Sequence, residues 1–359
     1  MSDSIVSAAH LRMMFDRLNA LDDLTMLEMA LSHGYQGHEA VAIVKAYRAL
    51  LSEVPPVPPT HNQSVRCLGI VGASSVPTAL WPYLLLAHCF RIPVKIKLPA
   101  SDLQSLGLLK SIFTCVSKPT DTFLNYSFES TWEISTQAGD VLLDGGFWND
   151  CDRILVFGSD AAVEVYRSHF AEPGRVIGFG HVESVLLVDL ASLQSDDRWM
   201  DDLLAFGHVG CLAPRLVVAA DDASPASVAE LMLGKLKGLV VPDVQRAVTL
   251  RNVFHELRVN GDDAWLSKDG MWLISSSHEY AMVASSGHLR IVPKARVLGT
   301  GCSIGALSKP AEACFVSNQL TEFDTQSTWI CEWGKAQYPS MLWQNGGVPI
   351  ITTVCRWPA

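Results

Sequence analysis

The sequence has no excess of basic residues. Lys and Arg together number 27 against 37 Asp and Glu, so the formal net charge is -10. Binding to nucleic-acid phosphates needs a basic face, and no local stretch rich in Lys and Arg provides one. We therefore expect no nucleic-acid partner.

The sequence also lacks a long apolar run. Its most apolar stretch, residues 78–90, is shorter than the roughly 20 residues that a bilayer-spanning helix needs, and Pro82 interrupts it. Residues 1–4 show neither the basic nor the apolar region of a secretory signal peptide. These features predict a cytoplasmic protein without a membrane span.

Paired cysteine motifs are absent. The nine cysteines stand singly at wide intervals, with no CxxC pair. This scatter is typical of reduced thiols in a cytoplasmic protein and not of a disulfide framework or a zinc site. We expect no metal centre, and we expect most of the cysteines to be buried packing residues.

What is present is the composition of a well-buried globular protein, with 49% apolar and 18% charged residues. At 359 residues the chain exceeds the roughly 250–300 residues at which single cores stop growing, so two domains are expected. Apolar residues at three- and four-residue steps predict helices over residues 7–51, separated near Gly34–Gly37. A stiff Pro-rich linker follows at residues 54–59.

From residue 65 onward the pattern alternates between strand and helix. Pro77, Ser101–Asp102 and Gly158–Asp160 are placed to begin helices. Repeated βα units with short loops predict an α/β fold with a mostly parallel, doubly wound sheet. The strands are expected at residues 65–71, 94–98, 153–157, 175–179, 184–189, 215–219, 271–275 and 288–292.

These elements predict four parts. Residues 1–60 form an N-terminal helical segment with the linker, and residues 61–200 form a dinucleotide-binding domain. Residues 201–325 form a second α/β domain, which contains Cys211. Residues 326–359, rich in Trp, Pro and Gly, form a C-terminal segment that packs back on both domains.

The standard dinucleotide motif GxGxxG is missing. Instead Gly72 and Gly158 each follow a strand and lead into a helix, whose N-terminus suits a pyrophosphate. Lys97 ends an apolar strand at the sheet edge where ligands bind, and can hold a ribose or its 2′-phosphate. Taken singly, the two glycines are more simply ordinary strand–glycine–helix turns, and Lys97 is more simply a solvated lysine at a strand end.

Cys211 lies in a Gly-rich segment between a predicted helix and a predicted strand. A nucleophilic thiolate needs access and a lowered pKa, and neighbouring backbone N–H groups supply part of that. Gly207 and Gly210 leave room for a substrate carbonyl to approach the backbone. The alternative for Cys211 is a buried structural cysteine.

Four segments taken in order resemble the aldehyde dehydrogenase superfamily: "GASSVPTALWPYLLLAHCFRIPVKIKLPASD" (72–102), "RILVFGSDAAVEVYR" (153–167), "GHVESVLLV" (180–188) and "FGHVGCLAPRLVVA" (206–219). Within it they are most similar to the acyl-CoA reductases of the bacterial luminescence aldehyde system (LuxC-like). The end of the chain, "ICEWGKAQYPSMLWQNGGVPIITTVCRW" (330–357), resembles the C-terminus of that family.

The resemblance implies a nucleophile, groups around it and a cofactor site. Ser75 stands where the superfamily has an asparagine that helps to bind the oxyanion, and losing such a donor typically costs ~10²–10³ in rate. Histidines near the nucleophile in sequence are candidates for moving its proton. The catalytic residues that the resemblance implies are Cys211 and Ser75, and the cofactor-binding residues are Lys97, Gly158, Ser159 and Gly180. His181 and His208 are catalytic candidates from their place in the sequence, and the alternative for each is a hydrogen-bonded structural histidine.

The resemblance also implies a reaction direction. Phe179 stands at about the place of the general-base glutamate that hydrolytic aldehyde dehydrogenases use to split their thioester intermediate. A thioester reductase must instead exclude water, so this departure favours reduction. We expect NADPH, with NADH as the other option, to reduce an acyl thioester to the aldehyde through a thioacyl-cysteine.

Two other functions remain open at this point: an acylating aldehyde dehydrogenase that uses NAD, and a non-catalytic subunit of a reductase complex. The expected substrate carrier is CoA or acyl carrier protein. An acyl-protein synthetase is the expected partner, and relatives imply a homo-oligomer.

Overall fold

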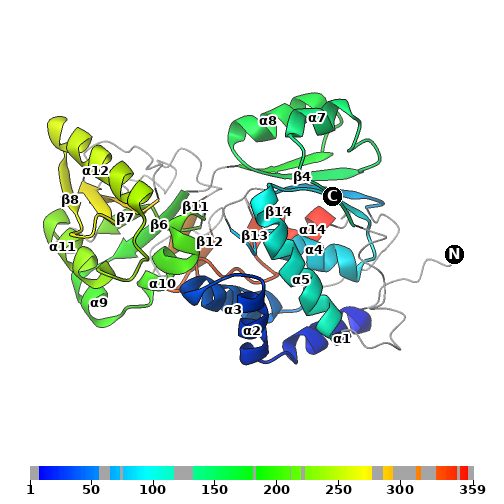
Figure 1. Ribbon diagram of the computed structural model, residues 1–359, viewed down its shortest axis with the longest axis horizontal. Coiled ribbons are helices and arrows are strands. Elements are labelled where there is room, and N and C mark those ends of the chain that lie inside the picture. The colour runs from blue at the N-terminus through cyan, green and yellow to red at the C-terminus, as the bar shows by residue number, and fades with distance from the viewer. Residues whose placement is uncertain are drawn as a thin grey trace, which may run out of the picture. The chain divides into compact units, whose positions relative to one another are not determined.

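The computed structural model describes residues 8–55, 65–72, 76–116, 132–180, 183–210, 212–219, 223–276, 286–293, 313–316, 329–345 and 348–354. The chain divides into two compact units. The first comprises Met1–His181 and Tyr338–Ala359, and the second comprises Val182–Gln337. Each unit contains a largely parallel sheet with helices (Figure 1), which confirms the predicted α/β class.

The first unit is built on a five-stranded sheet with the order β3-β2-β1-β4-β5, in which every pair is parallel. Helices α7 and α8 cover one face, and α4 and α5 cover the other (Figure 1). The sheet is therefore doubly wound, as predicted. Its strands are β1 (Leu68–Val71), β2 (Val94–Lys97), β3 (Trp132–Ser135), β4 (Arg153–Phe157) and β5 (Val176–Phe179), and its helices are α4 (Trp81–Cys89), η1 (Ala100–Asp102), α5 (Leu103–Val116), α7 (Gly139–Asp144), α8 (Asp160–His169) and α14 (Ile350–Val354).

Burial explains why these segments are strands. All four residues of β1 are buried, because β1 is a central strand covered on both faces. In β2, buried Val94 and Ile96 alternate with half-buried Lys95 and Lys97. Alternate residues of a strand point to opposite faces, so the two lysines share one face.

Helices precede this sheet, as predicted, and residues 8–55 contain three: α1 (Ala8–Asn19), α2 (Asp23–Ser32) and α3 (Gly37–Leu51). The apolar pattern predicted only the break near Gly34–Gly37, and the structure has a second one between Asn19 and Asp23. Both α1 and α2 contact α5. The Tyr47 hydroxyl donates to the carbonyl of Leu18 at 2.6 Å and ties α3 to the end of α1. The segment is thus part of the first unit.

Pro77 does not begin a helix, contrary to the prediction. Residues 77–80 form a turn, and α4 begins at Trp81 with Pro82 in its first turn. The missing N–H of Pro82 falls where no intrahelical partner exists, so this later proline is the one that suits a helix start. The carbonyl of Pro77 accepts a hydrogen bond from the Ser105 hydroxyl instead.

The second unit has a seven-stranded sheet with the order β12-β11-β6-β7-β10-β9-β8, parallel except for the β8–β9 pair. Its strands are β6 (Glu183–Val188), β7 (Leu216–Ala219), β8 (Asp263–Leu266), β9 (Leu273–Ser276), β10 (His288–Pro293), β11 (Ala313–Val316) and β12 (Trp329–Cys331). Its helices are α9 (Leu190–Ser195), α10 (Trp199–Leu204), η2 (Ala205–His208), α11 (Pro225–Leu236) and α12 (Val244–Val259).

The division of the chain falls earlier than the predicted boundary at residue 200. β6 pairs with β7 and β11 and so belongs to the second unit. The C-terminal part contributes to both units, with Trp329–Cys331 in the second sheet and the short β13 (Gln344–Asn345), β14 (Val348–Pro349) and α14 in the first unit.

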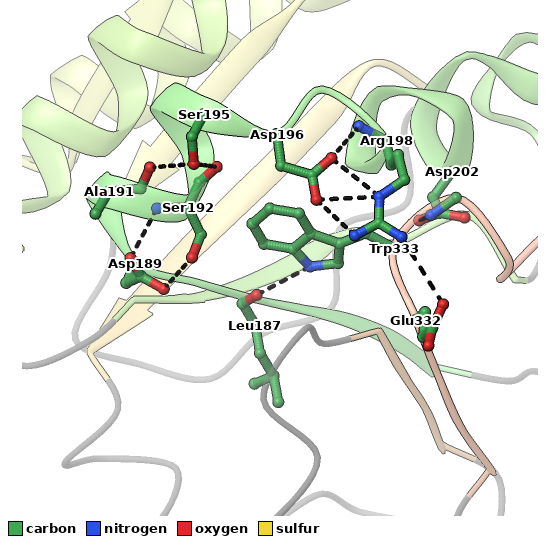
Figure 2. A network of polar contacts seen from close by, with 11 residues as sticks. Leu187, Asp189, Ala191, Ser192, Ser195, Asp196, Arg198, Asp202, Glu332 and Trp333 are labelled. Atoms are coloured by element: carbon green, nitrogen blue, oxygen red, sulfur yellow. Dashed lines mark hydrogen bonds and ion pairs between the residues drawn. The ribbon is translucent and has the colours of Figure 1, made fainter.

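A buried carboxylate anchors residues 332–337 to the second unit. Asp202 is fully buried, and its carboxylate accepts hydrogen bonds from the backbone N–H groups of Gly334 at 2.6 Å and Ala336 at 2.8 Å. Nearby, the indole of Trp333 donates to the carbonyl of Leu187 at 3.2 Å, and Arg198 pairs with Glu332 at 3.8 Å (Figure 2). Together these contacts hold the segment against β6 and α10.

In the part of the chain that the structure describes, no helix combines the length and the apolar character that crossing a membrane requires.

Candidate functional site

The first sheet has its topological switch point between β1 and β4. Strands β2 and β3 extend the sheet on one side of β1, and β4 and β5 extend it on the other side. In open α/β sheets ligands bind at this point, outside the carboxyl ends of the strands. β1 ends at Val71 and β4 at Phe157, so the segments that begin with Gly72 and Gly158 border the predicted cofactor site.

Lys97 lies at the same edge of the sheet. Val71 is in register with Lys97 on β2 and with Val156 on β4, so Lys97 is two strands, roughly 10 Å, from β4. Lys95, on the same face, donates to the carbonyl of Phe147 at 2.9 Å in the segment between α7 and β4. Lys97 therefore faces the α7 and α8 side.

The two lysines differ in their partners. Lys95 pairs with Asp150 at 2.7 Å and with Glu133 at 3.3 Å. The half-buried Lys97 has no ion pair or hydrogen bond from its ammonium group to the described residues. Lys97 is thus the cation that remains available to a ligand at this edge.

Gly158 and Ser159 lead into α8. Ser159 is the N-cap, and its hydroxyl oxygen accepts from the backbone N–H of Ala162 at 3.2 Å, while the hydroxyl can still donate. The helix N-terminus adds a positive dipole end. An available ammonium, a donor hydroxyl and a helix N-terminus are groups that suit a phosphate-bearing nucleotide.

Gly180 follows β5 and meets the start of α8. A Cβ atom at this position would lie 2.3 Å from Oδ1 of the exposed Asp160, so a side chain here would require that carboxylate to move. Asp160 places a negative charge at the N-terminus of α8, and this charge opposes a phosphate bound at the same helix end.

In the second unit, the residues before position 211 have an unusual backbone. Phe206, Gly207 and His208 have φ values of 52°, 66° and 64°, all in the left-handed region. This region costs non-glycine residues of order 1–3 kcal/mol each and persists only where surrounding contacts hold it. Phe206 and His208 are both buried.

The contacts that hold this backbone come from far along the chain, and we call them the clamp. The carbonyl of Gly207 accepts from Arg246 Nη1 at 3.1 Å and from the Ser286 hydroxyl at 2.8 Å. Arg246 also donates from Nε to the carbonyl of Met271 at 3.0 Å, and its guanidinium lies 4.9 Å from the ring centroid of Trp272. The clamp thus fixes the entry to the loop that carries residue 211.

His208 completes the clamp. Its Nε2 donates to the carbonyl of Pro214 at 2.8 Å, and its Nδ1 accepts from the backbone N–H of Gly287 at 2.8 Å. Burial lowers the pKa of His208 to about 3. The neutral ring therefore joins both sides of the loop, and its two occupied nitrogens do not favour proton transfer. The catalytic role expected for His208 stays a prediction.

This burial predicts a pH dependence of stability. The unfolded chain protonates His208 near pH 6.5 and the folded chain near pH 3, so between these values the unfolded state binds more protons. Stability consequently falls as pH falls through this window. His88 and His288, whose pKa values burial lowers to about 4, act in the same direction.

We expect His208→Gln, which keeps a donor for the Pro214 carbonyl, to flatten this decline by up to about 1.4 kcal/mol per pH unit. Urea unfolding between pH 4 and 7 measures it. An unchanged slope in the variant would show that His208 titrates alike in the folded and unfolded states.

Three predicted catalytic residues, Cys211, Ser75 and His181, lie outside the described residues. On either side of position 211 the backbone is described: the N–H of Ala213 donates to the carbonyl of Gly210 at 3.1 Å. The structure thus brings together Lys97, Gly158, Ser159 and Gly180 at one sheet edge and places His208 in the clamp of the second unit.

Residues 135–292 match the family model described as Acyl-CoA reductase (LuxC). Over this segment the chain is similar to acyl-CoA reductases. The matched segment covers less than half of the 359 residues. It includes positions 158, 159, 180, 208 and 211, whereas Ser75 and Lys97 precede it. A search of curated proteins gives no match.

Two solved structures are similar to almost the whole chain. An oxidoreductase from Marinobacter aquaeolei has a TM-score of 0.66 at 10% identity, covering 97% of this chain and 83% of that one. A 3,6-anhydro-L-galactose dehydrogenase in complex with NAP has a TM-score of 0.57 at 10% identity, covering 92% and 84%. At this identity the likeness concerns the fold.

Sequence reasoning did not find the clamp residues Arg246 and Ser286. They lie 39 and 79 positions from Gly207, and no spacing rule connects such distant residues. The sequence features that could have pointed to the clamp were Gly207 and His208, because both lie within four positions of the proposed nucleophile, Cys211.

Proposed function

We propose that the protein reduces an acyl thioester, carried by CoA or acyl carrier protein, to the aldehyde with NADPH through a thioacyl bond at Cys211. The observation that carries this proposal is the acyl-CoA reductase match, which spans residue 211 and the clamp that precedes it. Rigid backbone around a nucleophile supports covalent catalysis, because a small misplacement of the reacting atom costs rate.

The chain's own residues account for the covalent step. The Cys211 thiolate attacks the thioester carbonyl, the carrier thiolate leaves, and the acyl group remains on Sγ. The Ser75 hydroxyl is the proposed donor to the developing oxyanion, and His181 the proposed proton carrier. When bound, NADPH supplies the hydride, after which the aldehyde departs and Cys211 is free again.

The ends of β4 and β5 support reduction over hydrolysis. Phe179, at the expected place of a general base, stacks on Phe157 with ring centroids 4.6 Å apart, and Tyr83 lies 5.7 Å from Phe179. Phe179 is only 7% exposed. A buried aromatic side chain offers no base to activate water, which favours reduction of a thioester over its hydrolysis.

The cofactor part of the proposal rests on the switch point of the first sheet. Lys97 and the Ser159 hydroxyl at the start of α8 are the proposed contacts to the 2′-phosphate and the pyrophosphate. The dehydrogenase of similar fold was solved with NAP. Lys97 makes NADPH the preferred form, because an ammonium with no partner among the described residues gains most from an added phosphate.

We expect Lys97→Met to raise the KM for NADPH about tenfold or more while changing the KM for NADH little. Lys95→Met is the matched control on the same strand and face. Its ammonium is already held by Asp150 and Glu133, so the KM for NADPH should stay near the wild-type value. Equal KM values for NADPH in wild type and Lys97→Met would contradict the assignment.

The experiment that tests the proposed function is intact mass measurement after mixing the protein with a panel of acyl-CoAs without nicotinamide. We expect a mass gain equal to one acyl group, and aldehyde after NADPH is added. If acyl-CoAs fail, acyl carrier protein thioesters are tried next. No adduct with either carrier would overturn the proposal and favour a non-catalytic subunit.

A further inference from the structure

Two of the nine cysteines, which the sequence separates widely, meet in the first unit. Cys67 directly precedes β1, and Cys151 precedes β4 by two residues. Their Sγ atoms lie 3.5 Å apart. Because both residues precede their strands, the pair lies at the amino edge of the sheet, opposite the proposed cofactor site.

The backbone holds these two residues side by side. The N–H of Asp152 donates to the carbonyl of Cys67 at 3.0 Å, and the Asp152 carboxylate accepts from the N–H of Arg66 at 2.6 Å. A disulfide requires an S–S distance of about 2.05 Å, so closing this pair needs a movement of roughly 1.5 Å. Cys151 lies between the turn that ends at residue 150 and the start of β4 at Arg153, so such a shift breaks no strand pairing.

The two thiols differ in character. The hydrogen bond from the Cys151 thiol lowers the pKa of Cys67, and the same contact together with burial raises the pKa of Cys151. The charge of Lys95 favours a Cys67 thiolate, while Asp150 and Asp152 oppose it. Cys67 is 7% exposed and Cys151 is 1% exposed. Cys67 is therefore the thiol that meets a small oxidant first.

A carboxylate lies beside the thiols. Ligand atoms of Cys67, Cys151 and Asp150 lie within 4.8 Å of one another, which is the spacing of a possible metal site. However, Asp150 is exposed and pairs with the ammonium of Lys95 at 2.7 Å. The ammonium of Lys95 beside Asp150 disfavours a metal ion at this place. The two cysteine sulfur atoms that remain are better suited to a redox pair.

We propose that Cys67 and Cys151 form a peroxide-sensitive dithiol that closes to an intramolecular disulfide, a modification site separate from the catalytic Cys211. The Cys67 thiolate attacks hydrogen peroxide and becomes a sulfenic acid, with loss of hydroxide. The Cys151 thiol then attacks that sulfur, forms the S–S bond and releases water. In sum, two thiols lose two electrons and two protons, and one peroxide becomes two waters.

The test uses the full chain and does not depend on enzyme activity. The protein is treated with hydrogen peroxide, remaining thiols are alkylated, and an unreduced digest is analysed by mass spectrometry. We expect a linked peptide pair that contains Cys67 and Cys151 and disappears after dithiothreitol. Cys67→Ser and Cys151→Ser should each abolish the linked pair. In Cys151→Ser no second thiol can react with the Cys67 sulfenic acid, so Cys67 should be oxidised further to sulfinic and sulfonic acid.

Two other cysteines serve as controls. Cys89→Ser, a substitution of another buried thiol, should leave the linked pair unchanged, and the exposed Cys115 reports general oxidation in every sample. Absence of the linked pair at peroxide levels that oxidise Cys115 would overturn the proposal. So would one equivalent of zinc in the purified protein that is lost in Cys67→Ser.

Discussion

Cys211→Ala should take up no acyl group from any acyl thioester, and its reductase activity should fall by at least about 10³-fold. Removing a covalent nucleophile eliminates the step on which every later one depends, and such losses in comparable enzymes are of this size or larger. The substrate should still bind, because the alanine removes one sulfur atom and adds nothing. The measurement is intact mass with acyl-CoA, followed by the rate of aldehyde formation with NADPH.

Controls separate this result from misfolding or nonspecific acylation. Cys115→Ala removes an exposed thiol of α5 and should keep both the adduct and the activity. The thermal transition of Cys211→Ala should match wild type, since the clamp contacts that hold residues 207 and 208 do not use residue 211. Acylation of Cys211→Ala at the wild-type rate would place the nucleophile elsewhere.

Asp202→Ala should lower the free energy of unfolding of the second unit by about 2–4 kcal/mol, the largest stability effect we expect of a single polar side chain here. The substitution leaves the backbone N–H groups of the partly buried Gly334 and the buried Ala336 without the carboxylate that accepts from them. Buried donors without acceptors cost their full desolvation penalty. Thermal and urea unfolding, followed by tryptophan fluorescence, measure the loss.

Two variants calibrate this effect. Asp202→Asn keeps one acceptor oxygen but turns an NH2 group toward the other backbone N–H, so its cost should approach that of alanine. Asp189→Ala removes a partly exposed N-cap carboxylate of α9 that accepts from the N–H of Ser192 at 2.8 Å (Figure 2), and it should cost only about 1 kcal/mol. Equal losses for Asp189→Ala and Asp202→Ala would show that burial does not decide the cost.

Most strands could be predicted because their signal is local. The apolar run at 68–71 and the alternation at 94–97 are visible in single windows, and the predicted strands there are confirmed. β3 was missed because it is a four-residue edge strand with an exposed Glu133. The helix start after Gly158–Asp160 could be predicted for the same reason, because the strand, the glycine and the first residues of the helix are adjacent in the chain.

The sequence by itself determined the α/β class, the helical N-terminal segment, the family resemblance and the strand ends that carry Lys97 and Gly158, because each depends on neighbouring residues. Only the tertiary structure decided that β6 joins the second sheet, that Arg246 and Ser286 hold a left-handed backbone before residue 211, and that Cys67 meets Cys151. These pairings join residues tens of positions apart, and which distant groups meet is set by the packing of whole elements, which no local pattern encodes.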